Sequence, residues 1–294
     1  MTLHEAVKEF LLAKLAGGRS PRTLKRYEEV LTAFETLVGG RDLADVTPRH
    51  IRRFLASYRT RGCTPETLLS HYNVLRCFFN WLQREYQLTH NPIGAVDRPL
   101  VPSLLPKSLT ADQVKALLKA VTETRKPERN TALVMLMLDT GIRVGEACNL
   151  QREHIDLENR HVRVFGKDKR ERQLPVGEKT TEAFKVYFET RNDDLPSAFV
   201  TFRGESARPM TVRVVQSLFK RLSKVVGFHV NPHLLRSTFG SIWITNGGDE
   251  ESLRQMLGHT TYAMTRRYVR LRMSDLHDKH AKFSPLAGGK EKEA

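Results

Sequence analysis

An irregular, proline-containing stretch separates two helical patterns in this chain. The helical period of the apolar residues ends near residue 91, and four prolines follow within a short distance, Pro92, Pro99, Pro102 and Pro106. Proline lacks a backbone N–H and interrupts helices, so this stretch continues neither pattern. We therefore expect two domains, residues 1–95 and residues 108–294, joined by a linker over residues 96–107. The 294 residues suffice for both, because a single domain commonly takes about 100 to 200 residues.

The charge of the chain indicates a polyanionic partner. The formal net charge is +15, and the isoelectric point is about 9.9. Such an excess raises the local concentration of polyanions and supports binding to a phosphate backbone, so nucleic acid is the first partner to consider. A generally basic soluble protein is the alternative, and charge alone does not separate the two.

Membrane, secreted and zinc-binding classes are disfavoured by the sequence. No apolar run approaches the roughly 20 residues of a membrane helix. The first residues lack the basic start and the apolar stretch of a signal peptide, so we expect a cytoplasmic protein. Cys63, Cys77 and Cys148 are far apart and form no CxxC pair, which supports neither a disulfide framework nor a zinc site.

The first domain is predicted to be entirely helical. Apolar residues recur at a helical period over residues 3–16, and three later helices begin where Ser20, Thr47 and Thr64 each precede a proline. A hydroxyl caps the free N–H groups of a first turn, and proline is accommodated at the first helical position. The second and fourth helices carry basic residues that we expect to contact nucleic acid, with solvated helix faces as the alternative. These residues are Arg22, Lys25, Arg26, His71 and Arg76.

The second domain is predicted to be mostly helical with a small sheet. Helical patterns begin after Thr110 and cover the apolar segment TALVMLMLDTG. The segments HVRVF and RQLPV flank a short polar stretch and are typical of a β-hairpin. Helical patterns dominate again afterwards. The expected fold class is therefore mainly α, with a small antiparallel sheet in the second domain.

Basic side chains in the second domain are candidates for binding a phosphate. Arg143 lies between two expected helices, and its planar guanidinium can hold two oxygens of one phosphate. The alternative is a pair with Glu146 on a helix surface. Lys167 lies at the hairpin tip, near Arg170 and Arg172 as DNA-binding candidates. A partly desolvated lysine there could donate a proton to a leaving oxygen, and a solvated, charged hairpin is the alternative.

Two clusters nearer the C-terminus contain histidines. In NPHLLRSTFG, His233 and Arg236 share a face near a helix N-terminus, where backbone N–H groups favour an anion. A core histidine beside a surface arginine is the alternative. In LGHTTYAMTRRYV, His259 lies at a turn and Tyr268 follows nine residues later, with Tyr262 as a rival nucleophile. A tyrosine hydroxyl, with a pKa of about 10, needs cationic neighbours to act as a nucleophile.

The order of these groups resembles the catalytic signature of the tyrosine recombinases, the lambda-integrase family, and especially its Xer-like bacterial members. Five segments each resemble a family box in the expected order: LTADQVKALL, TGIRVGEACNL, GKDKRERQLP, PHLLRSTFG and LGHTTYAMTRRYV. The resemblance implies a helical core-binding (SAM-like) domain before the linker and a catalytic domain after it.

The resemblance also implies a catalytic set, Arg143, Lys167, His233, Arg236, His259 and Tyr268. Tyr268 would be the nucleophile, and Lys167 the general acid for the departing 5′ hydroxyl. The two arginines would clamp the phosphate oxygens with help from His259. His233 would act in proton transfer or orient the tyrosine.

The implied activity is site-specific recombination through a 3′-phosphotyrosyl intermediate, in integration, excision or dimer resolution. Four protomers would assemble on double-stranded DNA, as a homotetramer or with a paralogous recombinase, in the bacterial cytoplasm or nucleoid. Because the covalent bond stores the phosphodiester energy, no metal, cofactor or ATP is expected. A DNA relaxase of the type IB topoisomerase class and a non-catalytic DNA-binding regulator on the same fold are the alternatives.

Overall fold

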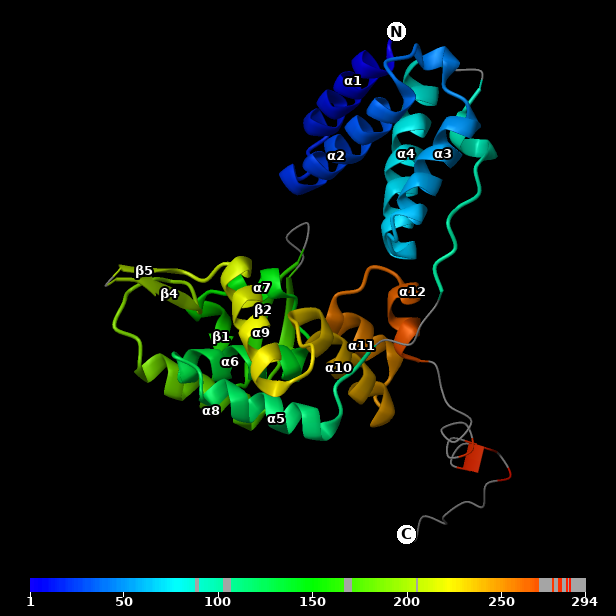
Figure 1. The fold of residues 1–294 in the computed structure, drawn as a ribbon. Coiled ribbons are helices and arrows are strands. Elements are labelled where there is room, and N and C mark those ends of the chain that lie inside the picture. The colour runs from blue at the N-terminus through cyan, green and yellow to red at the C-terminus, as the bar shows by residue number, and fades with distance from the viewer. Residues whose placement is uncertain are drawn as a thin grey trace. The chain divides into compact units, whose positions relative to one another are not determined.

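The computed structural model describes most of the chain. The described residues are 1–87, 90–102, 107–166, 171–204, 206–269, 277, 280, 281, 284 and 286. Met1–Leu104 form one compact unit and Leu105–Ala294 form a second (Figure 1). Helices dominate, and the strands form small antiparallel sheets, so the predicted mainly α fold class is confirmed. Among the described helices, none combines the length and the apolar character that crossing a bilayer requires.

Four α-helices and two short 3₁₀ helices make up the described part of the first unit. They are α1 (Leu3–Ala16), α2 (Pro21–Val38), η1 (Leu43–Asp45), α3 (Pro48–Thr60), α4 (Pro65–Glu85) and η2 (Pro92–Ala95). Three of the α-helices begin with proline, as the Ser-Pro and Thr-Pro pairs predict. The Ser20 hydroxyl accepts a hydrogen bond from the N–H of Thr23 at 3.2 Å, and Thr64 accepts one from Thr67 at 3.3 Å. These caps satisfy donors that the first turn leaves free.

Aromatic side chains fill the core of the first unit. Its largest buried members are Phe10, Phe34, Phe54, Phe78 and Phe79. The rings meet edge to face, as in the pair of Phe34 and Phe54, whose centroids lie 5.4 Å apart. Such a pair contributes about 0.5–1.5 kcal/mol beyond the burial of its area. Helix α4 packs against the other three α-helices and is therefore buried on several sides.

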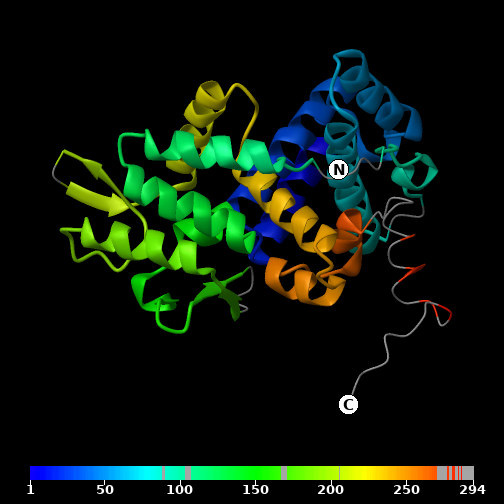
Figure 2. The ribbon, with the colours of Figure 1, turned by 90° about the horizontal axis from the view of Figure 1, so that it is seen from below.

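The second unit carries the sheets and the remaining helices (Figures 1 and 2). Its helices are α5 (Ala111–Thr122), α6 (Pro127–Thr140), α7 (Val144–Cys148), η3 (Arg152–His154), α8 (Glu178–Glu189), α9 (Val212–Val226), α10 (Pro232–Thr245), α11 (Glu250–Leu257), α12 (Tyr262–Thr265) and η5 (Arg266–Tyr268). Its strands are β1 (Ile155–Asp156), β2 (His161–Phe165), β3 (Glu171–Pro175), β4 (Val200–Arg203) and β5 (Ser206–Pro209). Helix α6 packs against α5, α8 and α10, and its apolar residues are almost all buried.

Strands β2 and β3 form the predicted hairpin, and β1 pairs with β2 to complete a three-stranded antiparallel sheet. In the register, Val162 faces Leu174 and Val164 faces Arg172. Partners across an antiparallel ladder lie on the same face of the sheet. Because the two valines and Leu174 are buried, this face is directed toward the core. Arg172 therefore also lies on the inner face of the hairpin.

Candidate active site

The turn after α6 fixes the position of an arginine. Helix α6 ends at Thr140, and Gly141 takes a left-handed conformation with φ of 62°. A β-carbon on Gly141 would lie 2.7 Å from side-chain atoms of both Leu257 and Phe239, so only glycine fits this conformation and this close approach. Arg143 follows as the residue that caps the N-terminus of α7.

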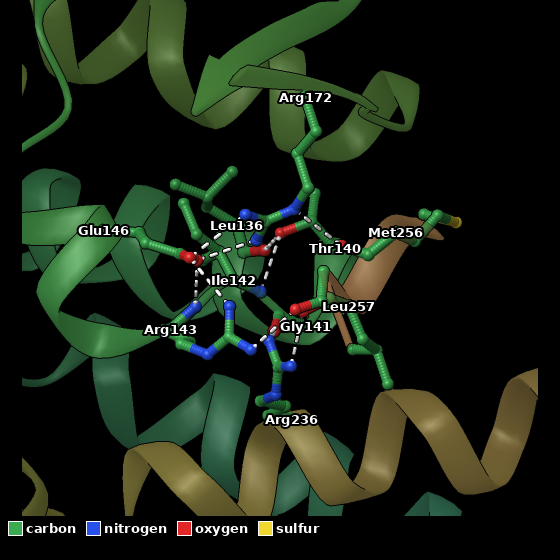
Figure 3. A network of polar contacts seen from close by, with 11 residues as sticks. Leu136, Thr140, Gly141, Ile142, Arg143, Glu146, Arg172, Arg236, Met256 and Leu257 are labelled. Carbon is green, nitrogen blue, oxygen red and sulfur yellow. Dashed lines mark hydrogen bonds and ion pairs between the residues drawn. The ribbon is translucent and has the colours of Figure 1, made fainter. Parts of the chain in front are cut away.

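Arg143 is held by a carboxylate and by a backbone carbonyl (Figure 3). Its Nη1 donates a hydrogen bond to Oε1 of Glu146 at 2.9 Å, and its backbone N–H donates to Oε2 at 2.9 Å. Its Nη2 donates to the carbonyl of Gly258 at 3.0 Å. The pair with Glu146 that the sequence offered as an alternative is therefore present, but within a larger network. The side chain is 39% exposed, which leaves part of it open to a ligand.

Arg236 projects from α10 into the same network and is almost completely buried. Its Nη1 donates to the carbonyl of Gly141 at 2.7 Å, and its Nη2 donates to that of Leu257 at 2.6 Å. Burial lowers the pKa of Arg236 to about 10, and the charge of Arg143 acts in the same direction, whereas Tyr268 acts against it. The guanidinium therefore stays charged at neutral pH, close to Arg143 and Tyr268.

Three successive carbonyls at the end of α11, those of residues 256–258, each accept a hydrogen bond from a different arginine. The donors are, in that order, Arg172, Arg236 and Arg143, at 3.0, 2.6 and 3.0 Å. We call these three carbonyls the carbonyl array. The last carbonyls of a helix have no partner within the helix and carry partial negative charge, which favours cationic donors. The array thus gathers side chains from β3, α10 and the start of α7 at one turn.

His259 follows the carbonyl array directly. Its backbone N–H donates a hydrogen bond to the backbone carbonyl of Arg254 at 3.0 Å, and Nη1 of Arg254 donates one to the backbone carbonyl of His259 at 3.2 Å. Nδ1 of His259 shares a hydrogen bond of 2.8 Å with Oγ1 of Thr265. Both side chains are buried, so the imidazole is held in one orientation.

Tyr268 lies in the short 3₁₀ helix after α12 and is 8% exposed. Its ring packs with apolar residues of α10 and α11 and lies over Gly240, where a β-carbon would come within 3.0 Å of Cε1. The ring of His259 is nearly parallel to it, at 6° and with 6.4 Å between centroids. Tyr268 therefore belongs to the same cluster as His259 and Arg236.

Tyr262, the rival nucleophile, has a different setting. It is 53% exposed, and its hydroxyl donates to Oε2 of Glu251 at 2.6 Å. This hydrogen bond raises the pKa of Tyr262 above its ordinary value, with the charge of Glu251 adding to the effect. A hydroxyl bound to a carboxylate is a poor candidate for attack on an anionic phosphodiester.

Of the expected catalytic residues, Arg143, Arg236, His259 and Tyr268 are brought together by the structure. His233 is exposed in the first turn of α10, one turn before Arg236. Lys167 lies outside the described residues, as does Arg170.

Most of the expected DNA contacts of the first unit lie at its surface. Arg22 and Lys25 on α2 and Arg76 on α4 are exposed. Arg26 is half-buried, and its Nη2 donates a hydrogen bond to Oγ of Ser70 at 3.3 Å.

Two expected DNA contacts are not placed for such a role. His71 is 4% exposed, and its Nδ1 lies 2.7 Å from the carbonyl of Thr67 while its ring packs against Tyr58. Burial lowers the pKa of His71, so it is neutral in this setting. Arg172 is 14% exposed and is occupied by Glu146 and the carbonyl array. Neither side chain presents free charge to a phosphate.

Sequence reasoning missed the basic face of one helix, and it underestimated the number of arginines that one carboxylate binds. The exposed face of α9 carries Arg213, Lys220, Arg221 and Lys224. Helix α9 packs against α7, the helix that Arg143 caps. The signal that could have identified its basic face is the helical period with which apolar and basic residues recur.

The carboxylate is that of Glu146, which the sequence offered only as a surface partner of Arg143 and which binds both Arg143 and Arg172. Burial acts to raise its pKa, but the hydrogen bonds and charges of the two arginines outweigh burial and hold the pKa below its ordinary value. Glu146 is therefore ionised at neutral pH.

Comparison with known proteins covers both units. Residues 107–275 match the model of the phage integrase family, and residues 7–86 match that of the phage integrase N-terminal SAM-like domain. A protein of Chromohalobacter salexigens named tyrosine recombinase XerC is 32% identical over 295 residues, which cover 97% of each chain. Tyrosine recombinase XerA of Thermococcus onnurineus is 29% identical over 291 residues, which cover 99% of each.

Solved structures share the fold at lower sequence identity. The Tn1549 transposon integrase in complex with circular intermediate DNA is 18% identical, with a TM-score of 0.80 over 96% of this chain and 99% of that one. A lambda integrase dimer bound to a COC′ core site is 20% identical, with a TM-score of 0.77 over 91% of this chain and 95% of that one.

Proposed function

The chain belongs to the phage integrase family and is a tyrosine recombinase, and we propose that it cleaves and rejoins duplex DNA at specific sites with Tyr268 as its nucleophile. Family membership confirms the resemblance found in the sequence motifs. The observation that carries the choice of residues is the position of Tyr268 beside His259 and Arg236, with Arg143 on the same carbonyl array.

In the proposed reaction, the Tyr268 oxygen attacks the phosphorus of one DNA phosphodiester. The bond between phosphorus and this oxygen forms as the bond to the 5′ oxygen breaks, which leaves a 3′-phosphotyrosine. Tyrosine gives up its proton, for which His233 is the proposed acceptor, and the 5′ oxygen takes one from Lys167. Arg143 and Arg236 donate to the non-bridging oxygens, whose negative charge is greatest in the pentacoordinate transition state. Attack by a 5′ hydroxyl of another strand reverses these steps.

Both domains take part in holding the DNA. We assign residues 1–95 to the core-binding domain, residues 96–107 to the linker and residues 108–294 to the catalytic domain. The exposed basic residues of α2, α4 and α9 supply the charge that a phosphate backbone requires. A lambda integrase tetramer bound to a Holliday junction has the same fold, with a TM-score of 0.76. This relationship supports the proposal that four protomers assemble on the DNA. We further propose that the protomers are identical or mixed with a paralogue, and that they act in integration, excision or dimer resolution in the cytoplasm.

Trapping on a nicked suicide duplex tests the assignment of the nucleophile. The nick lets the short 5′-hydroxyl fragment diffuse away, so a protein that cleaves DNA remains covalently attached. We expect an adduct with the wild type and with Tyr262→Phe, and none with Tyr268→Phe, which should still bind DNA with nearly unchanged affinity. Failure of the wild type to form an adduct on its own site would refute the function.

A second assay separates recombination from relaxation. A supercoiled plasmid with two copies of the site should yield rearranged products with this enzyme. Relaxed circles without any exchange of partners would instead indicate an activity of the type IB topoisomerase class.

A further inference from the structure

Arg172 occupies an inward position on a strand, where a charged side chain needs compensation. It pairs with Val164 across the β2–β3 ladder and shares the buried face of the hairpin with Leu174. Its side chain is 14% exposed. Taking a guanidinium out of water is costly unless its donors are satisfied and its charge is balanced.

Both conditions are met, because each of its three nitrogens donates a hydrogen bond (Figure 3). Nη1 and Nη2 donate to Oε1 and Oε2 of Glu146 at 3.0 and 2.7 Å, and Nε donates to the carbonyl of Met256 at 3.0 Å. A two-pronged pair between a guanidinium and a carboxylate fixes direction as well as distance. The geometry requires arginine, since lysine has one nitrogen and cannot span three acceptors.

The two partners of Arg172 both lead to residues of the active site. Glu146 holds Nη1 and the backbone N–H of Arg143. Met256 begins the carbonyl array that binds Arg236 and Arg143 and precedes His259. Gly258 makes room for this arrangement, because a β-carbon there would lie 3.2 Å from Cζ of Arg172.

Arg172 also limits what Glu146 can do. With Arg172 in place, both carboxylate oxygens already accept hydrogen bonds from its guanidinium, and the side chain of Arg143 donates only one hydrogen bond to them. Without Arg172, Glu146 would be free to form the same two-pronged pair with Arg143. That pair would change the direction in which the guanidinium of Arg143 points.

We propose that Arg172 is a positioning residue for DNA cleavage, which holds Glu146 and the end of α11 so that Arg143 and His259 face the phosphate, and that it does not contact DNA itself. The inference rests on the proposed function and replaces the DNA contact expected from the sequence. Arg172 acts through Glu146 and the carbonyl array, not on the reacting atoms.

The test compares Arg172→Gln and Arg172→Lys with Arg163→Lys, a matched change on the opposite face of the same hairpin, where Nη2 donates to the carbonyl of Glu153 at 3.3 Å. The measurements are the cleavage rate at saturating nicked DNA, the dissociation constant over a salt series and the melting temperature. We expect both Arg172 variants to cleave about 10- to 100-fold more slowly, since small displacements of positioned groups have effects of this order. Their affinity and salt slope should stay at the wild-type values, and Arg163→Lys should match the wild type throughout.

Several outcomes would overturn the proposal. A phosphate contact would appear in Arg172→Gln as a salt slope lowered by roughly 0.9, because one fewer counterion is released. An unchanged cleavage rate in both Arg172 variants would show that the position is dispensable. Arg172→Lys retains the positive charge of the side chain. If Arg172→Gln alone fails to fold, the test therefore rests on Arg172→Lys, and cleavage by this variant at the wild-type rate would contradict the proposal.

A double-mutant comparison tests whether Arg172 works through Glu146. If they act as a unit, Arg172→Gln combined with Glu146→Gln should be no slower than the slower single variant. Losses that multiply would show independent roles and contradict the proposal. Absence of any adduct with the wild type would refute the proposed function instead, so the two failures are distinct.

Discussion

The ring of Tyr268 lies so close to the backbone of Gly240 that a β-carbon on Gly240 would come within 3.0 Å of Cε1. Gly240→Ala should therefore displace the tyrosine and slow adduct formation several-fold, with DNA affinity unchanged. Alanine favours a helix interior over glycine by roughly 0.5–1 kcal/mol, so the melting temperature should not fall. Single-turnover cleavage of nicked DNA measures the effect, with Ser241→Ala on the same helix as the control. Cleavage at the wild-type rate would show that the ring adapts without loss.

Thr265 orients the imidazole of His259 through a buried hydrogen bond of 2.8 Å. Thr265→Val keeps the shape of the side chain but removes the hydroxyl, and it should lower the cleavage rate about 10-fold, the effect of a hydrogen bond of ~1–1.5 kcal/mol. Thr265→Ser retains the hydroxyl and should restore most of the rate. Equal rates for the valine and serine variants would mean that this hydrogen bond has no part in cleavage.

The buried position of Arg236 predicts that a lysine variant at this position loses activity as the pH rises. Burial lowers its pKa to about 10, which still leaves the guanidinium charged near neutral pH. Lysine starts from a lower ordinary pKa than arginine, and the same burial would lower the pKa of the lysine in Arg236→Lys further. A cation loses its proton as the pH rises through its pKa, so cleavage by this variant should fall as the pH is raised from neutral toward about 10. A flat profile over that range would contradict the assignment of Arg236 as a buried phosphate ligand.

The exposed basic residues of the first unit should control the salt dependence of binding. Each phosphate contact that is removed lowers the slope of log K against log salt by about 0.9. Arg22→Gln combined with Arg76→Gln should therefore flatten the slope and weaken binding. His71→Gln serves as the control, because His71 is buried and its replacement should lower the melting temperature without changing the slope. A slope that stays constant in the double arginine variant would remove both residues from the interface.

Local signals explain why so much of the first unit could be predicted from the sequence. A capping hydroxyl followed by proline acts within one turn, and the helices after Ser20, Thr47 and Thr64 begin as predicted. The exposure of His71 could not be predicted in the same way. Helix α4 packs against three neighbours, so its buried surface is wider than one stripe and includes His71.

The candidate site shows a similar division. The order of the motifs predicts Arg143, Arg236, His259 and Tyr268 as catalytic residues, and the structure places them close together. The part of Arg172 depends on the register of the β2–β3 hairpin and on the end of α11, and these segments meet only in the folded chain. From the sequence alone, Arg172 is a basic residue in a polar stretch and is expected at the surface. Its inward position follows only from its pairing with the buried Val164.

The carbonyl array has an evolutionary consequence. Three side chains from separate segments converge on residues 256–258, and Leu257 also packs with Tyr268. A substitution that altered the course of this turn would disturb four functional positions simultaneously, and no single compensating change could repair them. Substitutions that change this turn are therefore expected to persist only when β3, α7 and α10 change as well. The turn and these three elements should accordingly diversify together among related proteins.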